Sequence, residues 1–120
     1  MTRGARKEGL SRRHRFAGRG SFAVALRSPR KLRSASILLH VASGRGAESR
    51  LGLTIAKRLT RRSVDRNRMK RLAREAFRRH AVKSAGLDLV LAPRQPFSRD
   101  AEADWLAQVR DLLDRVAGEH

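Results

Sequence analysis

Arginine, lysine and asparagine recur along one stretch of the chain at spacings of three and four residues. When residues 63–80 are placed on a helix at about 100° per residue, one side collects Asn67, Lys70, Arg71, Arg74 and Arg78, and Arg66 and Arg68 flank that side. Guanidinium groups donate hydrogen bonds in a planar fork that matches phosphate, and asparagine can bond a base edge or a ribose hydroxyl. The chemistry that this pattern predicts is nucleic-acid binding.

The opposite side of the same predicted helix is apolar. It carries Met69, Leu72, Ala73, Ala76 and Phe77, so we expect this side to pack on a core. Like charges three and four residues apart repel and lower helix stability. The sequence indicates no acid on the basic face to offset that repulsion, which a polyanionic partner would relieve. Glu75, which lies off that face, is expected to pair with Arg78, Arg79 or Arg71 of the same helix. We therefore expect this face to contact nucleic acid rather than solvent alone.

Charge is unevenly distributed along the chain. Its 120 residues include 29 Lys and Arg against 11 Asp and Glu, which gives a net charge of +18 and a pI of about 12.0, typical of a nucleic-acid binder. Eleven bases lie in one short stretch: Lys57, Arg58, Arg61, Arg62, Arg66, Arg68, Lys70, Arg71, Arg74, Arg78 and Arg79. Only Asp65 and Glu75 oppose them, whereas acids outnumber bases from Asp100 onward. The partner is therefore expected to bind the middle of the chain.

Residues able to cleave RNA are not clustered in the sequence. Metal-assisted cleavage needs grouped carboxylates or histidines. The chain has no cysteine, and its four histidines, His14, His40, His80 and His120, lie far apart. Outside the last predicted helix the acids are isolated as well: Glu8, Glu48, Asp65, Glu75 and Asp88. An acid–base pair of His40 and His80 stays open at this stage, but we expect no catalytic residue and no metal site.

The elements that must position the basic face form a small α+β pattern. Residues 1–14 are expected to be a flexible basic arm and residues 15–118 a single RNA-binding domain. Strands are predicted at 36–43, at 51–56 and at 87–91, and the second is expected to return antiparallel to the first. The expected helices are a short one at 21–26, the basic one at 63–80, and a last one that starts at Asp100 and stops at Gly118. This order favours helices packed on one sheet.

The hydropathy pattern and the N-terminal sequence indicate where in the cell the protein is expected. No apolar stretch approaches the ~20 residues that a membrane span needs, and no apolar segment follows the basic N-terminus as in a secretory signal. We expect a cytoplasmic protein that has no membrane contact and needs no small-molecule cofactor.

The basic helix also resembles a known family. The stretch RNRMKRLAREAFR at 66–78 resembles the signature helix of the bacterial ribonuclease P protein component, and LGLTIAKRLTRRSV resembles the strand and connection that precede it. Upstream, SFAVALRSPRKLRSASILLHV resembles the family's first helix and strands, and LDLVLAPR resembles its last strand. The likeness runs from about residue 15 to residue 116 and covers nearly the whole chain.

The resemblance implies a fold, partners and a reaction. The fold is one mixed sheet of about four strands in the order α-β-β-β-α-β-α, with an uncommon left-handed βαβ crossover. The partners are the catalytic RNA of ribonuclease P and precursor tRNA, whose 5′ leader the ribonucleoprotein removes. Catalysis resides in the RNA, and the required Mg²⁺ is held by the RNA partner and substrate rather than by protein ligands.

The resemblance also assigns site residues. Arg66, Asn67, Arg68, Lys70, Arg71 and Arg74 fall in the RNA-facing signature, Lys57 and Arg58 match a basic pair before it, and Arg61, Arg62 and Arg78 complete the predicted RNA-binding set. Phe22 matches an aromatic that lines a cleft for the 5′ leader, and Leu26 and His40 stand where members commonly have aromatics. Thr60 replaces a usual glycine in the connection. We therefore expect weaker base stacking in this cleft.

Two other classes fit part of the pattern. A ribosomal or other structural RNA-binding protein would match the size and charge equally well, but not the signature helix. A DNA-binding regulator could place the basic helix in a major groove, but no preceding helix and short turn complete a helix-turn-helix. Identifying the bound RNA would distinguish the first alternative from a ribonuclease P component. Comparing the affinity for duplex DNA with the affinity for structured RNA would test the second.

Overall fold

The computed structural model of the chain describes residues 25–44 and 46–119. Within them the strands are β1 (Lys31–Arg33), β2 (Ile37–Ser43), β3 (Arg50–Leu53) and β4 (Leu87–Pro93), the helices are α2 (Ser63–Arg78) and α3 (Glu102–Glu119), and the short 3-10 helices are η3 (Ala81–Ser84) and η4 (Arg99–Ala101). Ala25 and Leu26 are also helical. The predicted arm at 1–14, the start of the predicted domain and most of the expected first helix lie outside the described residues.

The four strands form one mixed sheet in the order β1-β2-β4-β3. The strand β2 pairs antiparallel with both β1 and β4, while β3 pairs parallel with β4. The prediction that β3 runs antiparallel to β2 holds for its direction, but β4 lies between them, so these two strands are not neighbours. The nearly continuous apolar run of β4 suits this central position, where both faces of a strand are covered.

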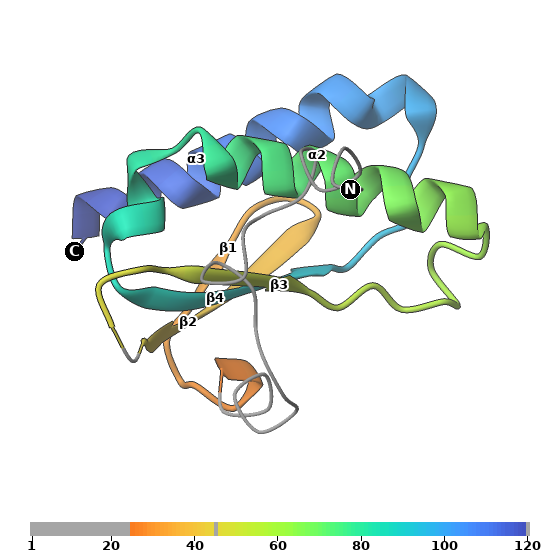
Figure 1. The fold of residues 1–120 in the computed structure, drawn as a ribbon. Helices are drawn as coiled ribbons and strands as arrows, with labels where there is room; N and C mark the ends of the chain where they lie inside the picture. The colour runs from red at the N-terminus through yellow and green to blue at the C-terminus, as the bar shows by residue number, and fades with distance from the viewer. Residues whose placement is uncertain (1–24, 45, 120) are drawn as a thin grey trace, which may run out of the picture.

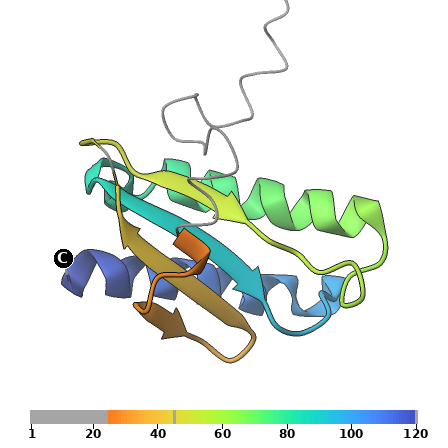
Figure 2. The same cartoon turned by 90° about the horizontal axis from the view of Figure 1, so that it is seen from below.

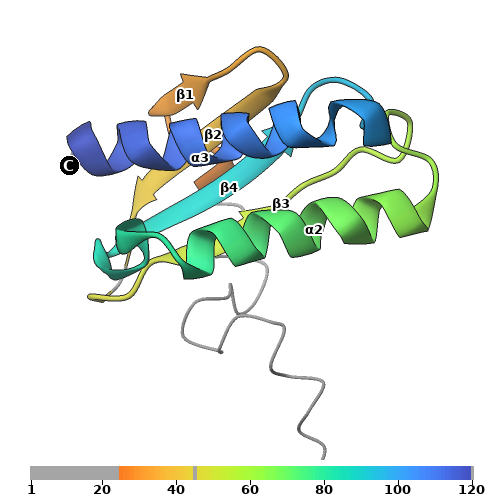
Figure 3. The same cartoon turned by 90° about the horizontal axis from the view of Figure 1, so that it is seen from above.

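The connection from β3 through α2 to β4 joins two parallel neighbours, and its hand is unusual. Seen from the helix side with β3 and β4 running to the right, β4 lies above β3 (Figure 3), and the view from below agrees (Figure 2). This arrangement is a left-handed crossover, whereas about 98% of such connections are right-handed. The expectation drawn from the family resemblance is confirmed.

Both long helices cover the same face of the sheet (Figure 1). Alternate strand residues face them, and the core includes Ile37, Leu39, Val41, Leu51, Leu89 and Leu91 from the sheet. From α2 the core takes Met69, Ala73 and Phe77, each fully buried, and α3 adds Trp105, Val109, Leu112, Leu113 and Val116. The apolar side predicted for the basic helix therefore packs as expected, which fixes the direction of its polar side.

The ends of the last helix differ from the prediction. A turn of 3-10 helix, η4, precedes α3, and the Ser98 hydroxyl accepts a hydrogen bond from the Asp100 amide at 3.2 Å. The helix α3 continues through Gly118 to Glu119, so the predicted stop at Gly118 is wrong. Glycine costs only about 1 kcal/mol inside a helix, and the buried Val116 anchors this last turn.

Candidate nucleic-acid interface

The polar side of α2 begins at a tight connection after β3. Here the Arg66 guanidinium donates hydrogen bonds to two backbone carbonyls, that of Thr60 at 2.9 Å and that of Arg61 at 2.7 Å. Arg66 thus closes the connection onto the first turn of the helix. Four predicted RNA-binding residues project from this corner and are exposed: Lys57, Arg58, Arg61 and Arg62. These four side chains form a dense cationic group that faces solvent.

The middle of α2 carries three polar side chains that form no hydrogen bond or ion pair with other described residues. Asn67 and Arg71 are exposed and Lys70 is half-buried. Among the residues that the structure describes, these three make no side-chain hydrogen bond or ion pair. Arg74 lies half-buried on the same side of the helix. Because Met69, Ala73 and Phe77 fix the opposite side in the core, this row faces away from the protein.

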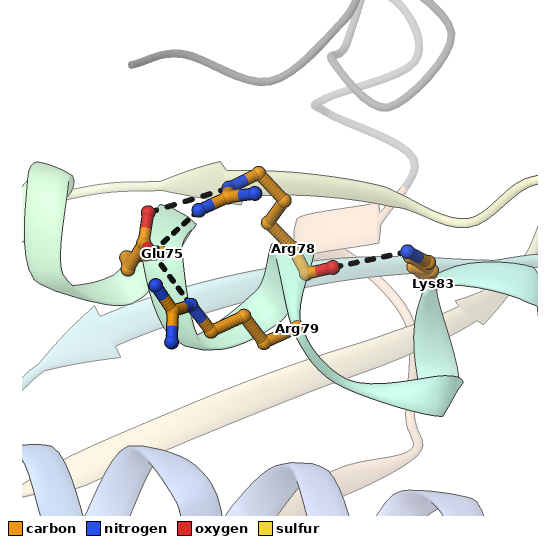
Figure 4. Close-up of polar contacts among 4 residues, drawn as sticks. All are labelled: Glu75, Arg78, Arg79 and Lys83. Carbon is orange, nitrogen blue, oxygen red and sulfur yellow. Dashed lines mark hydrogen bonds and ion pairs between the residues drawn. The ribbon is translucent and has the colours of Figure 1, made fainter. Parts of the chain in front are cut away.

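The end of the row is partly neutralised. The Glu75 carboxylate receives hydrogen bonds from Arg78 at 2.5 Å and from Arg79 at 2.7 Å, and the Lys83 ammonium donates to the Arg78 carbonyl (Figure 4). These arginines hold the pKa of Glu75 below its ordinary value. The expected pairing of Glu75 with arginines of its own helix is therefore confirmed for Arg78 and Arg79, and it offsets part of the charge at this end of the basic face. The two arginines and Glu75 together keep a net charge of +1.

Arg68 is directed sideways, toward α3. Its Nε and Nη2 atoms donate to the two carboxylate oxygens of Glu102, with Nη2 and Oε2 2.8 Å apart. The hydrogen bond and the opposite charge raise the pKa of Arg68 and lower the pKa of Glu102, so both groups stay ionised. Arg68 was predicted to face RNA, and the structure places one edge of its guanidinium against the protein's own acid.

The predicted leader-cleft residues lie on the other face of the sheet. His40 occupies the centre of a row that crosses all four strands, beside Lys31 on β1 and Val90 on β4, with Gly52 beyond on β3. Its side chain points away from the helices because its neighbours in β2, Leu39 and Val41, point into the core. His40 is 8% exposed, and its Nδ1 atom has no hydrogen-bond partner among the residues that the structure describes.

The segment 25–30 passes over this same face (Figure 1). Two hydrogen bonds attach it to β2: the Ser28 hydroxyl donates to the Val41 carbonyl at 2.5 Å, and the Val41 amide donates to the Arg30 carbonyl at 3.0 Å. Leu26 is half-buried at the start of this segment. The structure therefore brings Leu26 and His40 to one face, while Phe22 lies outside the described residues.

His40 makes stability depend on pH. Burial, followed by the charges of Lys31 and Arg94, holds its pKa below the ordinary 6.5. The unfolded chain then binds the proton more readily than the fold does, so stability is complete above about pH 6.5 and falls as the pH drops toward the lowered pKa. We expect His40→Gln to flatten the part of this decline that starts as the pH drops below about 6.5. Urea unfolding at a series of pH values measures it, and an unchanged decline in the variant would assign the effect elsewhere.

The residues suited to hydrolytic chemistry stay apart in the fold. His40 lies on the sheet face away from the helices, whereas His80 follows α2 on the helix side, where its Nε2 atom lies 2.6 Å from Asp114 Oδ1. The His40–His80 acid–base pair left open by the sequence is therefore not formed. Within residues 25–44 and 46–119 no three histidines or acids form a potential metal site. No helix in that part of the chain is long and apolar enough to cross a membrane.

Sequence reasoning missed several residues that shape the site. Glu102 and Arg99 reach α2 from a distant part of the chain, and no spacing pattern signals such a contact. Lys31 and Arg94 contribute the charge around His40. The pairing of Lys31 with His40 follows from the register of β1 on β2, but β1 is only three residues long and has no recognisable alternation of its own.

Comparison with known proteins gives a consistent result. Residues 10–117 match the family model described as Ribonuclease P. The chain is 37% identical over 109 residues to the ribonuclease P protein component of Thioalkalivibrio sulfidiphilus, covering 90% of this chain and 87% of that protein. It is 41% identical over 87 residues to the ribonuclease P protein component of Nitrosomonas europaea, covering 72% of this chain and 73% of that protein.

Solved structures with the same fold come from two other bacteria. The RNase P protein of Thermotoga maritima superposes with a TM-score of 0.66 at 23% identity and covers 84% of this chain and 96% of that one. The RNase P protein of Staphylococcus aureus gives a TM-score of 0.67 at 23% identity, covering 88% and 93%. At this identity the two structures bear on the fold alone.

Proposed function

The chain belongs to the ribonuclease P protein family, and from this premise we propose that it binds the catalytic RNA of ribonuclease P and the 5′ leader of precursor tRNA, promoting endonucleolytic removal of the leader. Membership by itself makes the chain a protein component of an endoribonuclease complex with an RNA partner and a role in tRNA processing. The identity of that RNA as the catalyst, the contact with the leader and a cytoplasmic location are parts of the proposal.

The observation that carries the RNA contact is the polar row of α2. Asn67, Lys70 and Arg71 point away from the core, and their side chains make no hydrogen bond or ion pair within the described part of the chain. Neutralising a phosphate with each cation releases condensed counterions, which favours assembly at low salt. The exposed cations at the start of the helix extend the same surface along the connection from β3.

The substrate contact is proposed for the opposite face of the sheet. Single-stranded RNA binds where cations follow its backbone and flat side chains stack on its bases. Lys31 and Arg94 supply the cations beside His40 in this chain, and Phe22 is the aromatic that the family pattern adds. An RNA partner on α2 and a substrate strand below the sheet would then lie on opposite sides of one thin domain.

Catalysis in this proposal belongs to the RNA. The described acids near α2 are engaged by arginines: Glu75 by Arg78 and Arg79, and Glu102 by Arg68. Carboxylates held in this way are poor ligands for Mg²⁺, which prefers carboxylate oxygens together with several waters and phosphates. We therefore place the required Mg²⁺ on the RNA partner and substrate. The protein would contribute positive charge that reduces repulsion between two RNAs.

Reconstitution tests the proposal. We expect the protein alone to leave precursor tRNA intact. Added to the catalytic RNA of ribonuclease P, it should permit cleavage at the mature 5′ end at a lower Mg²⁺ concentration than the RNA needs unaided. Gel analysis of end-labelled precursor over a Mg²⁺ series measures both. Cleavage by the protein alone, or no change in the Mg²⁺ requirement, would contradict it.

A precursor with a leader and a mature tRNA form the matched pair of substrates. If the sheet face binds the leader, the protein should tighten binding of the precursor to the complex more than binding of mature tRNA. Equal effects on the two would remove the leader contact from the proposal and leave the contact with the catalytic RNA standing.

A further inference from the structure

The contact between Arg68 and Glu102 has a geometry that fixes the guanidinium plane. Two parallel hydrogen bonds join Nε and Nη2 to the two carboxylate oxygens. This two-point contact uses one edge of the guanidinium and leaves Nη1 on the other edge. The Arg68 side chain is 38% exposed, so part of it remains open to solvent beside this contact, whereas the Glu102 side chain is only 23% exposed.

A second ion pair crosses the same junction in the opposite sense. Asp65, in the first turn of α2, lies 3.6 Å from Arg99 in η4, measured from Arg99 Nε to Asp65 Oδ1. One pair thus has its base on α2 and the other has its acid there. Together they join the N-terminal half of α2 to the segment that leads into α3.

We propose that Glu102 is a positioning residue for RNA binding, one that holds Arg68 so that the outer edge of its guanidinium is presented to the RNA. The inference rests on the proposed function, because it concerns the same interface. A long side chain loses rotamer freedom when it binds, and a side chain already fixed in the free protein loses less. A single ammonium could not replace this arrangement, because it lacks the planar fork.

Positioning and plain electrostatics predict opposite results at Glu102. Removing an acid beside the interface makes the protein more positive, which by charge alone strengthens binding to RNA. If Glu102 instead orients Arg68, the loss of the carboxylate frees the guanidinium and weakens binding despite the extra positive charge. The sign of the change therefore separates the two explanations.

The test compares Glu102→Gln with Glu75→Gln in the full chain, using the catalytic RNA of ribonuclease P as the probe. Each change removes one carboxylate that holds arginine on or beside α2. We expect Glu102→Gln to raise the Kd about threefold to tenfold, and Glu75→Gln to lower the Kd and steepen its salt dependence, since it releases Arg78 and Arg79. Filter binding over a salt series gives the Kd, its slope and the active fraction of protein.

A loss of folded protein would lower the active fraction rather than raise the Kd of the remainder, so it is told apart from positioning. Arg68→Lys supplies an independent variant that keeps the charge and loses the fork; it should weaken binding to a similar degree. Unchanged or tighter binding by Glu102→Gln, or an unchanged Kd for Arg68→Lys, would overturn the inference. Failure of the α2 interface as a whole would appear separately, as unchanged binding when Lys70 and Arg71 are replaced.

Discussion

The double variant Lys70→Ala/Arg71→Ala should bind the catalytic RNA of ribonuclease P roughly 100-fold more weakly than the unchanged chain. Contacts to charged groups contribute about 1.5–3 kcal/mol each, and about 1.4 kcal/mol corresponds to a factor of ten. The slope of log K against log salt should fall by about two, because each lost phosphate contact removes close to one unit. Both side chains lack internal partners within the described residues, so the melting temperature should change little. Binding titrations at several salt concentrations measure the affinity and the slope.

Arg110→Glu is the matched control for this variant. It lowers the net charge by the same two units but acts on the exposed surface of α3. We expect a much smaller loss of affinity, because the effect depends on where the charge lies. Equal losses in the two proteins would show that total charge, and not the polar row of α2, governs RNA binding. Arg66 and Arg68 are left unchanged because they bond the connection and Glu102.

Phe77→Ala should lower the free energy of unfolding by about 3–5 kcal/mol, the usual range for removing a buried phenylalanine side chain. Phe77 is fully buried and packs with Met69 and Ala73 between α2 and the sheet. The cavity would lie directly beneath the polar row, so the loss should reduce the RNA-binding population as well as the stability. Urea unfolding followed by circular dichroism measures the change.

Leu72→Ala provides the comparison within the same helix. Leu72 is only half-buried, so less apolar surface is lost on truncation and we expect a cost clearly below that of Phe77→Ala. Addition of RNA should raise the urea concentration at the midpoint of unfolding for both variants, because a ligand that binds the folded state stabilises it. Similar costs for the two substitutions would contradict the burial pattern of α2.

Much of the binding helix could be predicted from the sequence. The 3.6-residue period requires Met69, Ala73 and Phe77 to share one side, and any helix with that pattern must turn Asn67 and Arg71 to the other side. The starts of α2 and β4 and the extent of β2 were predicted to within a residue for the same reason, since hydrophobic periodicity is a local property. The strand β1 has too few residues to show a period, and it entered only through the family resemblance.

The sequence by itself determined that one helix carries a cationic side opposite an apolar one. Only the tertiary structure decided which cations stay available. Arg68 meets Glu102, Asp65 meets Arg99, and His40 lies beside Val90, all through contacts between residues distant along the chain. The physical reason is that periodicity gives the direction of a side chain relative to its own element. Its partners depend on how the elements pack, and here that packing includes a left-handed crossover which places β4 between β2 and β3.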